Sequence, residues 1–142
     1  MNLAFRRDII PAFYQFPMDD NPYGIGRYDD IWSGLVAKKC IDHIRGRIVN
    51  GFPLCEHNKW PRSTFGDLLL EAPGYESNEE FSRDLDDIEV SGSGFGDLAR
   101  RIADELSFRG STEFIRYCGR HLGRWVDACE ELGAVRLDAT NT

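Results

Sequence analysis

The chain has 142 residues, 42% hydrophobic and 12% aromatic, which is long and apolar enough for one compact domain with its own core. Its 24 acidic residues outnumber 17 basic ones, and the net charge of -7 argues against general binding to nucleic acid or to anionic membranes. Because no apolar run could span a bilayer and the first ten residues lack the order of a secretory signal, we expect a cytoplasmic protein.

The first part of the chain predicts short, mixed elements. Residues 2–5 favour a strand or the end of one, and residues 6–15 favour a helical turn or two interrupted at Pro11. Residues 16–27 are dense in proline, glycine, asparagine and aspartate, which predicts a long irregular loop. Long loops in compact domains are often functional.

A helix is predicted over residues 29–45, followed by extended structure. Trp32, Val36, Cys40 and Ile44 recur every four residues and define an apolar stripe, so we expect Trp32 in the core. Residues 47–51 then favour a strand, and residues 52–59 an extended segment.

The second half of the chain predicts helices with charged outer faces. Helices are expected over 64–71 and 78–88, separated by Pro73 and Gly74, and again over 97–108 and 112–132. The acids between Glu79 and Asp87 are read as a solvated face. The predicted fold class is therefore α/β up to about Trp60, with helices afterwards.

Three alternating glycines, Gly92, Gly94 and Gly96, superficially resemble a dinucleotide-binding turn. The fingerprint G-x-G-x-x-G is not matched, and Asp97 stands where the third glycine belongs and would repel a phosphate. A linker between helices is the favoured interpretation.

The four cysteines lack C-x-x-C spacing and lie in apolar stretches, so buried free thiols in a reducing compartment are expected. Structural zinc is a disfavoured alternative, because its ligands would come from pairs without the spacing of a known finger. Those pairs are Cys40 with His43, Cys55 with His57, and Cys118 with His121, while Cys129 has no such neighbour.

Asp29 and Asp30 adjoin at the predicted start of the helix, directly after the loop. Acids are favoured there by the free N–H groups and the helix dipole, so capping alone explains the pair. The same carboxylates could instead take a proton or steady positive charge at a reacting carbon. The residues alone leave both interpretations open.

Four ordered segments resemble the reversibly glycosylated polypeptides, a family that includes the UDP-arabinopyranose mutases. They are NLAF at 2–5, IGRYDDIWSG at 25–34, CIDH at 40–43 and GFPLCEHNK at 51–59. The resemblance covers about sixty residues. It implies a GT-A-like glycosyltransferase fold that acts on a UDP-sugar with a divalent metal, Mn²⁺ or Mg²⁺.

In that family an N-terminal half with the acidic metal motif precedes these segments. By resemblance, residues 1–62 are a partial GT-A-like catalytic region, the C-terminal portion of that fold, and residues 63–142 a helical C-terminal extension packed on it. The chain then looks truncated, and loss of the first half would remove most nucleotide contacts and leave apolar surface uncovered.

The resemblance also suggests roles for individual residues. Asp29 and Asp30 become expected catalytic acids facing the acceptor or sugar, and His57 an expected metal ligand. Arg27, Gly26 and Lys59 are expected to bind substrate, Arg27 by gripping a diphosphate. An ion pair to a neighbouring acid is an equally favoured role for Arg27.

Two functions follow as expectations. The first is a UDP-sugar mutase or glycosyltransferase-like enzyme, incomplete as an isolated chain. The second is a non-catalytic interaction subunit, or remnant, that docks onto a full-length relative as part of a homo- or hetero-oligomer.

Overall fold

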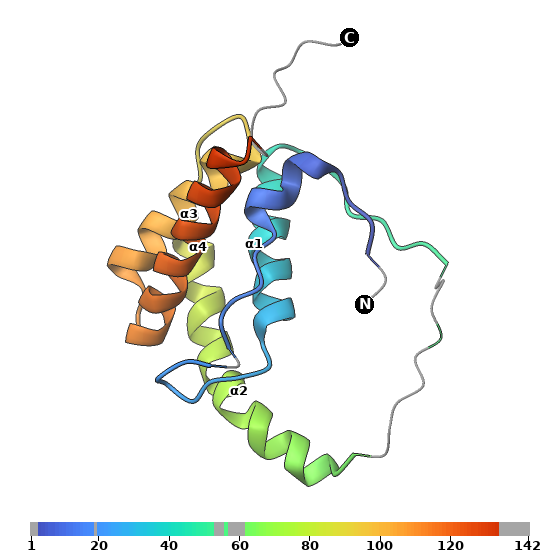
Figure 1. Ribbon diagram of the computed structural model, residues 1–142, viewed down its shortest axis with the longest axis vertical. Coiled ribbons are helices and arrows are strands. Elements are labelled where there is room, and N and C mark those ends of the chain that lie inside the picture. The colour runs from blue at the N-terminus through green and yellow to red at the C-terminus, as the bar shows by residue number, and fades with distance from the viewer. Residues whose placement is uncertain (1–2, 19, 53–55, 57–61, 134–142) are drawn as a thin grey trace.

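The computed structural model describes residues 3–18, 20–52, 56 and 62–133, and its elements are helices packed around one core (Figure 1). In chain order they are the 3-10 helix η1 (Arg7–Ala12), α1 (Asp29–His43), α2 (Thr64–Asp87), α3 (Phe95–Arg109) and α4 (Glu113–Glu131). No helix in this part of the chain is both long and apolar enough to cross a membrane.

The α/β fold class, with its GT-A-like portion, was wrong: the described residues contain helices and no strand. The described residues of the first expected strand, from Leu3 onward, and all of 47–51 lack regular secondary structure. A short apolar or β-branched run becomes a strand only when a neighbouring strand accepts and donates its backbone hydrogen bonds. The described residues offer these two segments no such neighbour.

The helix that begins at Asp29 was predicted correctly, whereas α2 runs through the expected break at Pro73. Contacts on both sides of the proline hold the two parts in one helix. Before it, Asp67 pairs with Arg27, and after it Phe81 is fully buried. Tertiary packing therefore overrides the local penalty of an interior proline.

Aromatic rings link α1, α2 and α4 in the core. Trp32 is fully buried and stacks on Phe81 with ring centroids 3.9 Å apart, which confirms its predicted place in the core. Its indole N–H donates to Asn78 Oδ1 at 3.1 Å, so the one polar atom of the ring is satisfied. The rings of Phe16 and Phe114 also pack against the Trp32 ring.

The N-terminal segment is fixed against the C-terminal helices. The Trp125 indole N–H of α4 donates to the Ile10 carbonyl at 3.0 Å, and the ring of Tyr14 lies on that of Trp125. Sequence-distant segments thus share one core, into which residues 3–52 and 62–133 both contribute side chains.

The last two helices were both predicted from the sequence, and in the structure α3 and α4 pack on each other as an antiparallel pair (Figure 1). Thr112 caps α4 by accepting a hydrogen bond from the Ile115 N–H at 3.2 Å. The glycine run acts as a connection: Gly92 has a φ of 144°, which favours glycine, and Gly94 is the N-cap of α3.

Candidate functional site

The paired carboxylates are the first two residues of α1. Tyr28 occupies the N-cap position without a capping side-chain hydrogen bond, and its carbonyl accepts from the Trp32 N–H at 2.9 Å. Among the described residues, neither Asp29 nor Asp30 makes a hydrogen bond or ion pair. The helix dipole favours both negative charges, and the carboxylate oxygens make no capping hydrogen bond.

The two acids face different surroundings. Successive helical residues are rotated by about 100°, so adjacent side chains diverge. Asp30 is exposed and lines a large groove, whereas Asp29 is half-buried and does not belong to the residues that line it. Asp30 is therefore the carboxylate better placed to meet a molecule lying in the groove.

The loop before the acids is held by local hydrogen bonds. The Asn21 amide donates to the carbonyls of Met18 and Ile25 at 3.0 and 2.7 Å, and its oxygen accepts from the Tyr23 N–H. Gly24 adopts a φ of 68°, which glycine takes without strain. This bonding fixes the chain direction into α1.

Arg27 is engaged by α2. Its φ is 66°, an uncommon value outside glycine, and its Nη1 lies 2.6 Å from Asp67 Oδ1 and 3.6 Å from Glu71 Oε1. The hydrogen bond with Asp67 raises the pKa of the Arg27 guanidinium. The structure thus contains the ion pair that was the alternative to diphosphate binding, and any anion would compete with two carboxylates.

Gly26 lies beside this arginine in a tight part of the loop, where a Cβ would approach the Met18 carbonyl at 3.4 Å. His57, Lys59 and Cys55 lie outside the described residues. Their predicted roles stay predictions.

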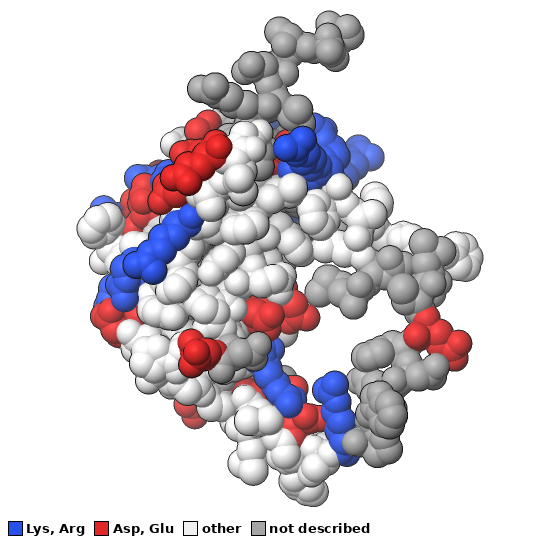
Figure 2. Space-filling model, in the orientation of Figure 1, with Lys and Arg blue, Asp and Glu red and all other residues white. Residues whose placement is uncertain are grey.

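A groove of about 620 Å³ runs between the N-terminal segment, α1 and the chain after it. Its walls are largely apolar, including Phe5, Ile31, Ile41 and Val49, and Asp30 and Arg47 supply charge. Uncharged surface also covers much of the face seen in Figure 2. The volume suits a sizeable ligand, but the lining suits an apolar chain better than a phosphate.

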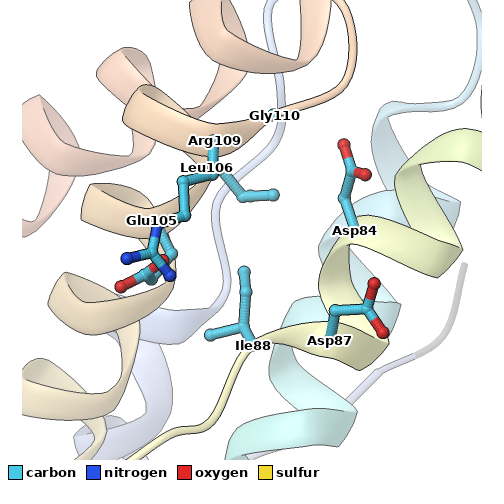
Figure 3. A pocket seen from close by; sticks show the side chains of 7 residues that line it. All are labelled: Asp84, Asp87, Ile88, Glu105, Leu106, Arg109 and Gly110. Atoms are coloured by element: carbon cyan, nitrogen blue, oxygen red, sulfur yellow. The ribbon is translucent and has the colours of Figure 1, made fainter.

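A second, smaller pocket of about 140 Å³ lies between α2 and α3 (Figure 3). Asp84 and Asp87 of α2 line one side of it, and Glu105 and Arg109 of α3 line the other. Glu105 is paired with Arg109 at 3.1 Å, and Asp84 accepts from the Ser111 N–H at 2.6 Å. It is smaller than the usual range for organic ligands, so it is a poor candidate site for a nucleotide sugar.

The part of the chain that the structure describes contains no group of three metal-ligating side chains. Asp29 and Asp30 diverge, so they do not by themselves form a shell for Mn²⁺ or Mg²⁺, which prefer several oxygen ligands. The described residues therefore do not fit a resident metal on their own.

Three of the cysteines are free and buried, as predicted: Cys40, Cys118 and Cys129. Burial raises the pKa of the Cys40 and Cys118 thiols to about 12. Such thiols stay protonated and are poor metal ligands and nucleophiles.

Sequence reasoning missed the partners that α2 supplies. Asp67 and Glu71 bind Arg27, and Asn78 binds Trp32. These pairs are separated by about 40 residues or more, and no local motif marks them.

Comparisons with known proteins connect the sequence of this chain to one family. A family model described as reversibly glycosylated polypeptide matches residues 1–97. UDP-arabinopyranose mutase 2 of Arabidopsis thaliana is 30% identical over 93% of this chain and 38% of its own length. UDP-arabinopyranose mutase 1 of Oryza sativa subsp. japonica is 47% identical over 93% of this chain and 37% of its own length. The chain thus spans less than two fifths of these relatives, and no solved structure matches it.

Proposed function

The chain belongs to the reversibly glycosylated polypeptide family, and on that basis we propose that it forms part of a UDP-sugar mutase of the UDP-arabinopyranose mutase type, or of a related glycosyltransferase-like enzyme. The observation that supports this most directly is the pair Asp29 and Asp30. Both carboxylates lack protein partners among the described residues, at the start of a helix in a family-matched segment.

The proposed chemistry rests on what a carboxylate can do. Asp30, at the edge of the groove, would accept a proton from a sugar hydroxyl or steady positive charge developing at the anomeric carbon. Asp29 is half-buried outside the groove lining, so it would accept a hydrogen bond only from a group that reaches beyond the groove to the loop side of α1.

The diphosphate and any divalent metal need groups in addition to those that the described residues supply. Arg27 is paired with Asp67, and the described residues gather no metal shell. We therefore propose that the chain acts as an incomplete portion of such an enzyme, in a complex with a full-length family member. Its protonated, buried thiols support a cytoplasmic location, where cysteines remain reduced.

The test is binding of a UDP-sugar in the presence of Mn²⁺, measured by calorimetry on the full chain alone and mixed with a full-length relative. We expect Asp30→Asn to weaken the chain-dependent binding about tenfold, because a charged hydrogen bond to the sugar is lost. Asp97→Asn is the matched control, since Asp97 is also an exposed acid in the first turn of a helix. No chain-dependent binding, either by the chain alone or in the mixture with the relative, would exclude the proposal.

A second candidate is a non-catalytic subunit that docks onto a full-length relative. The groove favours it, because Val49 in its lining is 82% exposed, and Phe52, three residues later in the chain, is 95% exposed; a complex would cover both. We expect Val49→Asp to abolish co-elution with the relative, while Asp30→Asn leaves it intact. Co-elution without any UDP-sugar binding by the chain would select this function over the first.

A further inference from the structure

The first half of α2 carries an apolar surface separate from the groove. This half projects beyond the rest of the molecule, at the lower end of the view in Figure 1. Phe65 and Leu69 are 81% and 76% exposed, and Leu68 and Leu70 are each more than half exposed. Four large apolar side chains in two turns of helix are thus left in water, an arrangement that marks interaction surfaces.

Two of these residues, Phe65 and Leu69, belong to a continuous exposed stripe that faces away from the core, and Leu68 and Leu70 flank it on either side. Residues three and four apart lie on one face of a helix, and Phe65, Leu69, Ala72 and Glu76 follow that spacing and are all exposed. The core contacts of α2 come from other positions, namely Gly74, Ser77, Phe81 and Leu85. The helix therefore packs on the core with one face and presents the stripe, here called the α2 stripe, to solvent.

Little holds this half of α2 in place within one chain. Arg27 pairs with Asp67 and Glu71, and Tyr75 packs edge-on against Tyr28. Half-exposed ion pairs such as these stabilise a fold only weakly, because water screens the two charges. A short helical segment without packing on its apolar side is marginal in water, so a partner on the stripe would stabilise it.

The charges at the two ends of the stripe indicate which partner fits. Arg62, exposed just before the helix, and Glu76, exposed after the apolar residues, are equally far from Leu69 in the sequence. If a second α2 lies antiparallel across the first with the two Leu69 residues in contact, each Arg62 meets the Glu76 of the other copy. The stripe is therefore self-complementary in charge as well as apolar, which is what a two-fold interface requires.

We propose that a second copy of this chain binds to the α2 stripe and forms an antiparallel, two-fold symmetric dimer centred on Leu69. This inference does not depend on the proposed function. Two helices bury less surface than a standard stable interface, so the dimer dissociates in the micromolar range of concentration.

The first experiment is sedimentation equilibrium of the full chain from about 1 to 200 µM, a range set by the expected micromolar affinity. The expected result is a mass that rises from the 16.2 kDa of one chain toward twice that value. Leu69→Glu should remain monomeric throughout, with an unchanged helical circular dichroism spectrum. Phe108→Glu on α3 is the matched control, because Phe108 is 83% exposed but lies outside the stripe, and it should dimerise like the unaltered chain.

The second experiment tests the antiparallel register through charge exchange. Arg62→Glu alone and Glu76→Arg alone each place like charges at both ends of the interface, and each should weaken dimerisation about tenfold. An equimolar mixture of the two single variants should form heterodimers of normal affinity, because both ends then pair opposite charges. The double variant R62E/E76R should also recover.

Three results would overturn the proposal. One is a chain that stays monomeric at 200 µM, the top of the range chosen above for a micromolar dimer. Another is a dimer that survives Leu69→Glu but is lost in Ile31→Glu, which would assign the contact to the groove. The third is failure of the mixed single variants to associate better than either variant alone.

Discussion

At the start of α1, Asp29 and Asp30 are both acidic but have different surroundings. Asp30 lines the groove, and Asp29 is half-buried beside it. The nearby Arg27 is held by α2 rather than left open to an anion. The residues of the candidate site thus supply negative charge and an apolar wall, and the positive charge of Arg27 is already paired.

His121 provides a residue-scale prediction about pH. Burial, then the charges of Arg124 and Arg120, lower the pKa of His121. Because the folded value lies below the unfolded value of about 6.5, the unfolded chain takes up the proton first as pH falls. Neutral His121 therefore contributes to the free energy of unfolding in full above about pH 6.5, and this contribution is lost as the pH falls from there toward the lowered pKa of the folded state.

We therefore expect the denaturant midpoint of His121→Gln to fall less than that of the unaltered chain between pH 7.5 and pH 5.5, in parallel urea titrations. His43→Gln, at an exposed imidazole near the end of α1, controls for loss of a histidine elsewhere. Equal pH dependence of His121→Gln and the unaltered chain would contradict the assignment.

At the scale of elements, the close contact between α3 and α4 depends on glycine. A Cβ at Gly119 would lie 2.5 Å from the Ser107 nitrogen and 2.8 Å from the Leu106 carbonyl carbon. At Gly123, on the same helix, the nearest atoms would be 3.8 Å away. Only the first position requires glycine for the two helices to approach.

Gly119→Ala is therefore expected to destabilise the fold by about 1 to 3 kcal/mol, because backbone must shift to admit the methyl group. Gly123→Ala should instead stabilise it by up to about 1 kcal/mol, since alanine favours a helix over glycine and the added methyl group would meet its neighbours at ordinary van der Waals distance. Chemical denaturation of both variants tests the pair. A stabilised Gly119→Ala would mean that the helices are not held at this distance.

Element prediction succeeded where the local pattern and the packing agree. The apolar repeat from Trp32 to Cys40 predicted α1, and the stripe from Phe114 to Cys129 predicted α4, because both helices bury the face that the repeat defines. The prediction of a break at Pro73 failed, because contacts on both sides of the proline keep α2 continuous. The prediction of a strand at 47–51 also failed, because the described residues contain no neighbouring strand with which it could pair.

For the whole molecule, local stability should differ between the core and the α2 stripe. Ile102 and Leu122 are fully buried between α3 and α4, whereas Phe65 and Leu69 are exposed. At concentrations below about 1 µM, under the expected dimer affinity, amides 66–70 should exchange with deuterium at least ~100-fold faster than those of Ile102 and Leu122. Hydrogen exchange by mass spectrometry measures both, and equal protection would contradict this distribution.

The candidate site was partly accessible from the sequence. Asp29, Asp30 and Arg27 were identified from their place in the loop and from family-like segments, because these signals are local. The ion pair that occupies Arg27 and the groove beside Asp30 were not, since both depend on chain segments brought together by folding.

By itself, the sequence determined the family, the two well-patterned helices α1 and α4, the buried thiols and the acids at the start of α1. These features are encoded in residue order and short-range periodicity. Only the tertiary structure decided that the described chain is helical, that α2 passes through Pro73, and that Arg27 binds Asp67. Each of these depends on contacts between distant residues, and their free energies exceed the local propensities that predicted otherwise.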